Sequence, residues 1–180
     1  NVLERLLVEK FEMSINSSYK TIVFSICENP ITQIRRICII LPEFALKEKF
    51  HHKWLKLICN LSFSLNIPIK VFGNEESEFD FDEYVHKYGK FINWDYHYFK
   101  ISEEEHLKFL TNKLSENDLL VFPASRRDFV SYHNFMYDYP EKIEKLFSGF
   151  DKLIIYPEQR NSSQSIQYFD KLSDSNITIE

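Results

Sequence analysis

The sequence predicts a three-layer α/β fold built around a mostly parallel sheet. Short apolar runs recur along the 180 residues, and most of them end at a proline or a glycine. Segments with apolar residues at helical spacing lie between these runs. Strands that alternate with helices in this way pair in parallel through right-handed crossovers. We therefore expect a sheet with helices on both of its faces.

The N-terminal part of the chain contributes one helix and two strands. Residues 1–12 are expected to form an amphipathic helix, because their apolar side chains recur on one face and charged side chains lie opposite. A strand is expected at 21–27, TIVFSIC, which Pro30 follows. The next strand is expected at 34–41, with the sequence IRRICIIL, and Pro42 closes it.

The middle of the chain continues the alternation. A long helix is expected at 44–65, a strand at 67–72 and an acidic helix at 75–87. An aromatic strand at 92–99 precedes a helix at 102–114, which begins with a capping box of the Ser-x-x-Glu type. The apolar face of the long helix consists of Phe50, Trp54, Leu57, Ile58, Leu61 and Leu65.

The C-terminal part supplies the most apolar strand. Residues 119–122 form a four-residue apolar run between Asp118 and Pro123, which is typical of a strand buried on both faces of a sheet. A long loop with some helix runs through to Leu146, and a last strand is expected at 152–156.

The strand pattern also suggests how the chain is organised. Residues 31–159 contain five strands and form one domain, with 160–180 as a C-terminal tail. The helix and strand within 1–30 do not fit a compact five-stranded unit, so we interpret them as the end of a preceding domain of the same kind. The chain begins at Asn1 without a methionine, which suggests an excised fragment. The strand at 21–27 is too apolar for an unpaired edge, so we expect it to pair with another strand.

Composition and charge exclude several classes of protein. Apolar residues make up 44% of the chain, which favours a folded domain. The net charge of −5 argues against nucleic acid as a partner, because phosphate binding needs a positive face. No apolar run reaches the roughly 18 to 20 residues that span a bilayer. Cys27, Cys38 and Cys59 lie in apolar runs and are expected to be reduced core thiols.

A candidate binding site follows the most apolar strand. In open α/β sheets, ligands bind in loops at the carboxyl ends of central strands. Here that loop contains a double arginine and hydroxyl side chains, which could form charge-assisted hydrogen bonds to an anionic small molecule. In the alternative interpretation, one arginine pairs with Asp128 or Glu141 and the other lies in solvent. The residues of the candidate site are Pro42, Glu43, Ser125, Arg126, Arg127, Ser131 and Tyr132.

The remaining polar residues do not indicate catalysis or a metal site. His51 and His52 are adjacent, so on a helix they point about 100° apart and cannot share a metal as an i, i+4 pair can. No Ser-His-Asp or Cys-His arrangement is visible, and we expect neither an enzyme nor a cofactor. The acidic run at 75–83, which interleaves with Phe79 and Phe81, is either a solvated helix start or a docking face for a basic loop.

Two segments carry a resemblance to a known family. The sequence DLLVFPASRRDFVSYHNFMYDYPEKIEKLF, followed by KLIIYPEQ, resembles the end of the cytoplasmic part of bacterial cation:proton antiporters. That part is similar to a tandem pair of universal-stress-protein-like domains. The resemblance covers about residues 1–159 and is most specific at 118–159. The matching residues are Ala124, Ser125, Arg126, Arg127, Ser131, Tyr132, Pro140, Leu146, Phe147, Tyr156, Pro157, Glu158 and Gln159.

The sequence also departs from nucleotide-binding universal stress proteins. Those proteins resemble one another in an Asp after the first strand and a glycine-rich loop after the fourth. Here Pro42 and Glu43 follow the first strand, and the turn PASRRDFVS contains no glycine. Without glycine the backbone cannot approach a polyphosphate closely, which argues against ATP binding in the usual manner.

The resemblance implies both a fold and a function. It implies the strand order third, second, first, fourth, fifth for the sheet from residue 34 onward. Universal-stress-like domains commonly pair through their last strands, so the resemblance also implies that residues 21–26 lie antiparallel beside the last strand at 152–156. It also implies a non-catalytic regulatory and assembly domain at the cytoplasmic face of the bacterial inner membrane, joined to a membrane antiporter domain in the same polypeptide. A homodimer is expected, because the helix at 1–12 would otherwise leave its apolar face uncovered. The alternative is a stand-alone universal-stress-type protein that binds a nucleotide or another small molecule.

Overall fold

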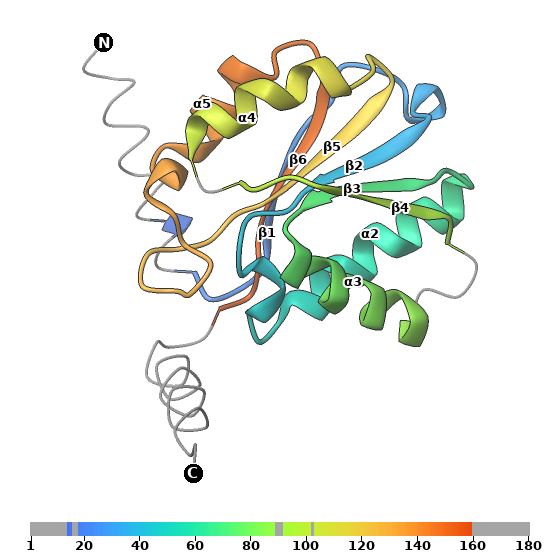
Figure 1. The fold of residues 1–180 in the computed structure, drawn as a ribbon. Helices are drawn as coiled ribbons and strands as arrows, with labels where there is room; N and C mark the ends of the chain where they lie inside the picture. The colour runs from blue at the N-terminus through green and yellow to red at the C-terminus, as the bar shows by residue number, and fades with distance from the viewer. Residues whose placement is uncertain (1–13, 16–17, 89–91, 102, 160–180) are drawn as a thin grey trace.

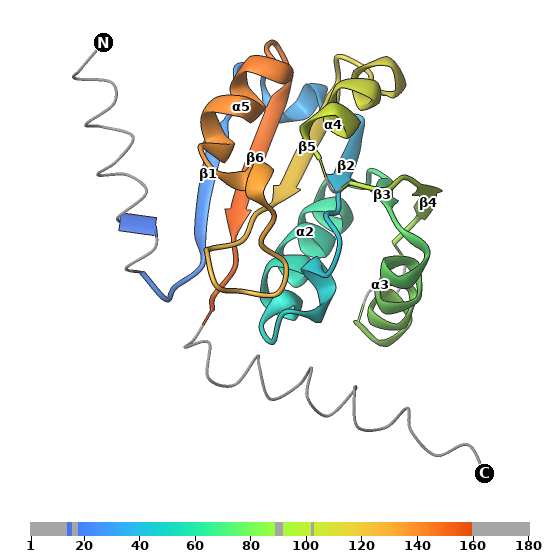
Figure 2. The same ribbon diagram turned by 60° about the vertical axis from the view of Figure 1, so that its left-hand side comes forward.

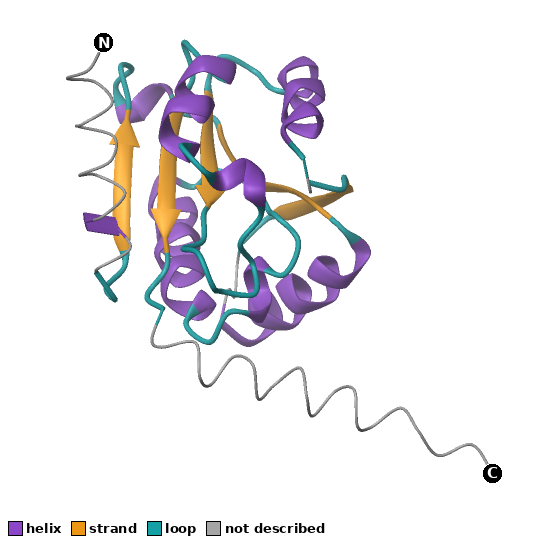
Figure 3. Ribbon diagram, turned by 90° about the vertical axis from the view of Figure 1, so that its left-hand side faces the viewer, coloured by secondary structure: helices purple, strands orange, loops and turns teal. Residues whose placement is uncertain are grey.

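The computed structural model describes residues 14–15, 18–88, 92–101 and 103–159. The helix expected at 1–12 and the tail at 160–180 lie outside these residues. Figure 1 shows a twisted sheet with helices packed on both faces, which confirms the expected α/β architecture. Figure 3 shows the same layers, with the helices in purple and the strands in orange. In the described part of the chain, no helix is long and apolar enough to cross a membrane.

Strands and helices alternate along the chain as the periodicity predicts. The strands are β1 (Ile22–Ile26), β2 (Arg36–Ile40), β3 (Ile69–Gly73), β4 (Trp94–Tyr98), β5 (Asp118–Pro123) and β6 (Asp151–Tyr156). The α-helices are α2 (His51–Leu65), α3 (Glu75–Tyr88), α4 (Glu104–Leu110) and α5 (Tyr139–Leu146). Short 3-10 turns occur at Ile31–Gln33, Ala45–Lys47, Thr111–Lys113 and Asn134–Met136.

The six strands form one sheet in the order β1-β6-β5-β2-β3-β4. The five strands from β2 onward are parallel neighbours. β1 runs antiparallel beside β6, with Ile22 opposite Tyr156 and Ile26 opposite Lys152. Two expectations are thereby confirmed: β2 and β5 lie side by side, and the strand at 21–27 pairs antiparallel with the last strand. Because β1 belongs to the sheet, the sheet has six strands rather than five.

Both faces of the sheet are covered by apolar side chains. In β2, Ile37 and Ile39 belong to the core under α2 and α3, whereas Cys38 and Ile40 belong to the core under α4 and α5. Successive residues of a strand point to opposite faces, so a continuous apolar run is what a two-sided core requires. All six residues of β5 are buried, which confirms the expectation for this strand.

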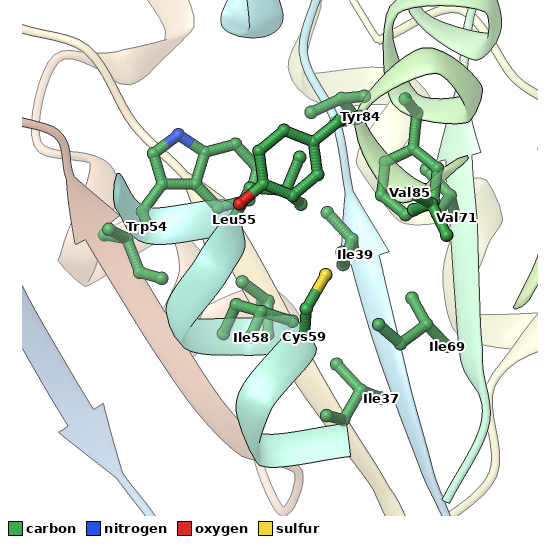
Figure 4. Packing of buried hydrophobic residues seen from close by; sticks show 14 of the residues in the cluster. Ile37, Ile39, Trp54, Leu55, Ile58, Cys59, Ile69, Val71, Tyr84 and Val85 are labelled. Atoms are coloured by element: carbon green, nitrogen blue, oxygen red, sulfur yellow. The ribbon is translucent and has the colours of Figure 1, made fainter. Parts of the chain in front are cut away.

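The first core lies between the sheet and the pair α2 and α3. Figure 4 shows Trp54, Ile58 and Cys59 of α2 packed towards Ile37 and Ile39 of β2. Full burial of a large apolar side chain stabilises the folded state by about 1.5–3 kcal/mol, so this cluster is a main source of stability. The second core is formed by α4 and α5, chiefly through Leu107, Leu110, Tyr139, Ile143 and Phe147.

The first helix over the sheet is shorter than expected. Instead of one helix from 44 to 65, a 3-10 turn at Ala45–Lys47 precedes α2. Phe44 has a φ of 62° and Glu48 is extended, so the backbone cannot continue as one helix. The buried stripe of α2 is also rotated, because α3 lies beside it: Leu55 is buried, whereas Leu57 is 48% exposed.

Two further expectations need correction. The helix expected at 102–114 begins at Glu104, and the N-cap residue Glu103 makes no capping hydrogen bond through its side chain. Ser102, the first residue of the expected capping box, lies outside the described residues. Cys38 is buried as expected, whereas Cys27 is exposed because it follows β1 at the edge of the sheet.

Candidate functional site

The candidate site lies where β2 and β5 end side by side. Leu41 and Pro42, which follow β2, are buried. The segment 124–138, which follows β5, forms a loop over this edge of the sheet and includes the short turn Asn134–Met136. This edge is the switch point of the parallel sheet, because β2 leads towards β3 on one side and β5 leads towards β6 on the other.

Arg126 is buried, and its guanidinium is bonded to three backbone carbonyls from two other segments of the chain. Its Nε donates to the carbonyl oxygen of Ile15 at 2.7 Å, and Nη2 donates to the carbonyl oxygen of Lys20 at 2.8 Å. Nη1 donates to the carbonyl oxygen of Pro157 and to Oε1 of Gln159. These bonds connect the loop after β5, the segment before β1 and the segment after β6.

Gln159 completes this connection. Its Oε1 also accepts a hydrogen bond from the backbone N–H of Arg126 at 3.1 Å, and its Nε2 donates to Oγ of Ser125 at 3.0 Å. The backbone N–H of Gln159 donates to the carbonyl oxygen of Tyr19 at 3.3 Å. Ser125, Arg126 and Gln159 are all at most 3% exposed, so this network is shielded from solvent. We refer to these three residues as the arginine clamp.

The two arginines of the turn have different environments. Burial lowers the pKa of the Arg126 guanidinium below its ordinary value, and within the described ranges no carboxylate forms an ion pair with it. Arg127 is exposed, with its guanidinium 5.2 Å from the centre of the Tyr137 ring. The alternative that one arginine pairs with Asp128 or Glu141 is therefore not what the structure shows, because Arg126 turns inward to carbonyl oxygens.

The far end of the loop is fixed by a buried carboxylate. Oε1 of Glu48 accepts hydrogen bonds from the backbone N–H of Ser131 at 3.1 Å and from its hydroxyl at 2.6 Å. His51 donates from Nδ1 to the carbonyl oxygen of Glu48 at 2.8 Å, and burial lowers the pKa of His51. His133 donates from Nε2 to the carbonyl oxygen of Glu43 at 3.3 Å. The loop is thus attached to the segment between β2 and α2.

An open hollow of about 590 Å³ remains beside this loop. It lies between the start of α4 and the stretch 132–135, and His133 stacks on Phe135 with ring centres 5.5 Å apart. A second hollow, of about 30 Å³, has room for about one water molecule. The larger hollow is lined by Glu103, Glu104, Glu105, Tyr132, His133, Asn134 and Phe135.

The structure distributes the expected site residues over three places. Ser125 and Arg126 belong to the arginine clamp, Ser131 is bonded to Glu48, and the backbone of Glu43 accepts from His133. Tyr132 is half-buried and lines both hollows, and Arg127 lines the smaller one. Pro42 is buried at the end of β2.

Two residues that organise this edge were not expected from the sequence. Glu48 lies inside the helix expected at 44–65, where no role was expected for it, and Gln159 was noted only as part of a motif. For Gln159, the available signal was the sequence Tyr-Pro-Glu-Gln at the end of the last strand, which places a polar side chain close to the buried Arg126.

Two buried thiols belong to the cores on the two faces of the sheet. The thiols of Cys38 and Cys59 are kept protonated, because burial raises the pKa of Cys38 to about 12 and that of Cys59 to about 11. Among the residues that the structure describes, no group of three or more His, Cys, Asp or Glu side chains is arranged to hold a metal ion.

No protein-family model matches the chain, and no curated protein sequence matches it.

Proposed function

We propose that the chain is a non-catalytic regulatory and assembly domain of a bacterial membrane cation:proton antiporter. In this proposal, the domain lies at the cytoplasmic face of the inner membrane and follows the membrane domain in the same polypeptide. The proposal includes a universal-stress-protein-like fold. The strand order supports that part of it, because β4-β3-β2-β5-β6 is a parallel unit to which β1 adds one antiparallel edge strand.

One observation carries the proposal. The two segments that resemble the antiporters, Ser-Arg-Arg after β5 and Tyr-Pro-Glu-Gln after β6, are bonded to each other in the arginine clamp. The same clamp holds the carbonyl oxygens of Ile15 and Lys20, which precede β1. The motif residues therefore connect the domain to the chain that leads into it. This is the connection that a domain attached to preceding segments of the same polypeptide requires.

The hollow beside the loop is the feature that the alternative function would use. A stand-alone protein that binds a small molecule would use a concave site at the switch point, and the volume of about 590 Å³ is within the range of ligand pockets. Its three glutamate side chains oppose an anionic ligand such as a nucleotide. The geometry at this edge therefore favours the assembly role, in which the loop serves as a connection.

Two measurements test the proposal. The coding sequence upstream of Asn1 should contain a series of apolar runs of about 20 residues each, long enough to span a bilayer. The full-length protein in membrane vesicles should then exchange cations for protons. We expect Arg126→Ala to change the cation concentration at half-maximal transport or the amount of assembled protein, whereas Arg127→Ala should leave both unchanged. Upstream sequence without apolar runs, or a full-length protein without exchange, would contradict the proposal and favour the alternative.

A further inference from the structure

The solvent-facing side of α3 presents an aromatic ring to water. Phe79 is 72% exposed, the highest value among the large hydrophobic side chains that the structure describes. Tyr98, on the neighbouring strand β4, is 62% exposed, and its hydroxyl donates a hydrogen bond to Glu78 of α3. This bond places the second exposed ring beside the same helix. Single exposed hydrophobic residues are common, but here one exposed ring belongs to α3 and a second exposed ring is bonded to the same helix.

Acidic side chains surround Phe79. Glu75 and Glu83 lie one helical turn before and after it, and Asp82 lies on the same side of the helix. Lys47 pairs with Asp80 at 2.9 Å and with Glu76 at 3.5 Å, and the His86 ring lies 3.1 Å from the carboxylate of Asp82. Among the described residues, neither Glu75 nor Glu83 forms an ion pair. We refer to Glu75, Phe79, Asp82, Glu83 and Tyr98 as the Phe79 face.

The stability of the helix does not account for this face. Carboxylates are favoured in the first turn of a helix, which explains Glu75. The helix dipole acts only within the first turn, so it gives no reason for Asp82 and Glu83 further along. The apolar packing of α3 against the sheet comes from its other side, where Phe81 is fully buried and Tyr84 and Val85 are nearly so. Phe79 contributes neither to the charge interaction with the helix dipole nor to the apolar packing of α3.

We propose that the Phe79 face docks a basic peptide segment of a partner protein. A guanidinium or ammonium group over the Phe79 ring would gain a cation–π interaction, and flanking lysines or arginines would pair with Glu75 and Glu83. An apolar residue of the segment would cover Tyr98. The face lies at the edge of the molecule away from β1, as Figure 2 shows, so it is separate from the arginine clamp. The inference goes beyond the proposed function and does not depend on it.

Fluorescence anisotropy with a labelled model peptide tests this inference. The peptide is about 15 residues long and combines lysines and arginines with leucine and tryptophan. We expect it to bind the full chain, and we expect Phe79→Ser to raise Kd at least tenfold. The double variant Glu75→Lys plus Glu83→Lys should do the same. All three positions are exposed, so circular dichroism should show unchanged folding.

A matched control comes from α2. Phe63 is 63% exposed, but α2 contains no Asp or Glu, so an aromatic ring is present there without the acidic surroundings. Phe63→Ser should change Kd less than twofold, and a peptide with lysine and arginine but no apolar residue should bind at least tenfold more weakly. Equal weakening by Phe63→Ser and Phe79→Ser, equal binding of the purely cationic peptide, or no binding at all would overturn the inference.

Discussion

Two neighbouring arginines in this chain have different roles, and burial decides which is which. Arg126 makes four side-chain hydrogen bonds, to the carbonyl oxygens of Ile15, Lys20 and Pro157 and to the side chain of Gln159. Arg127 lies in solvent beside the ring of Tyr137. A buried guanidinium is stable without a carboxylate only where its N–H groups find other acceptors, and here carbonyl oxygens provide them.

Removal of the Arg126 side chain should therefore be costly. We expect Arg126→Ala to lower the free energy of unfolding by about 2–4 kcal/mol, because it leaves buried carbonyl oxygens without donors. Arg127→Ala should cost less than about 1 kcal/mol, the worth of an exposed cation–π contact. Urea denaturation of the two variants measures the difference. If both variants unfold at the same urea concentration, the clamp does not stabilise the fold.

At the scale of the element, β1 is a partly exposed edge strand with polar contacts at both of its ends. Every second residue of the strand is half-buried and the residues between them are exposed, with Val23 at 40% exposure. Beyond its C-terminal end, Oδ1 of Asp151 accepts hydrogen bonds from the backbone N–H groups of Glu28 at 2.8 Å and Asn29 at 3.2 Å. At the other end, Oγ1 of Thr21 accepts from the backbone N–H of Glu158 at 3.1 Å. These polar contacts hold the strand in register beside β6.

Asp151 provides a test of this attachment. Asp151→Ala should speed amide hydrogen exchange in β1 and lower the free energy of unfolding by about 1–3 kcal/mol, because two backbone N–H groups lose their acceptor. Asp151→Asn keeps an oxygen that can accept from the same groups, so it should cost less than half as much. Hydrogen exchange followed by mass spectrometry measures the effect on the strand. Exchange in β1 of Asp151→Ala that is as slow as in the wild-type chain would show that this carboxylate does not hold β1.

At the scale of the whole molecule, β1 and β4 are the two edge strands of the sheet. β1 is the last strand on its side, and its outer edge has no neighbouring strand in the described part of the chain. An apolar strand with an unpaired edge favours association with another chain. We propose that a second copy of the chain covers this side, together with the apolar face expected for residues 1–12.

Sedimentation velocity measures the oligomeric state. We expect the chain to sediment as a homodimer at micromolar concentration, and substitution of Val23 by lysine should shift it towards the monomer, because a charge at an exposed edge opposes strand pairing. Val23 faces solvent, so this substitution should not unfold the domain. A wild-type chain that sediments as a monomer would contradict the prediction of a homodimer.

The sequence by itself determined the order of the elements and the two-sided core. Alternating apolar runs and amphipathic segments are local patterns, and each one reports the burial of its own residues whatever lies elsewhere in the chain. For this reason β5 was expected to be buried on both faces. The apolar character of the strand at 21–27 indicated that it is paired, but not which strand is its neighbour.

Only the tertiary structure decided how the polar residues are used. Arg126 meets Ile15 across 111 positions in the sequence, and Ser131 meets Glu48 across 83. Local patterns cannot predict such pairs, because any buried donor needs an acceptor but the sequence does not say which one lies nearby. The break before α2 has the same origin: Glu48 is held by the loop after β5, and the backbone leaves the helical conformation there.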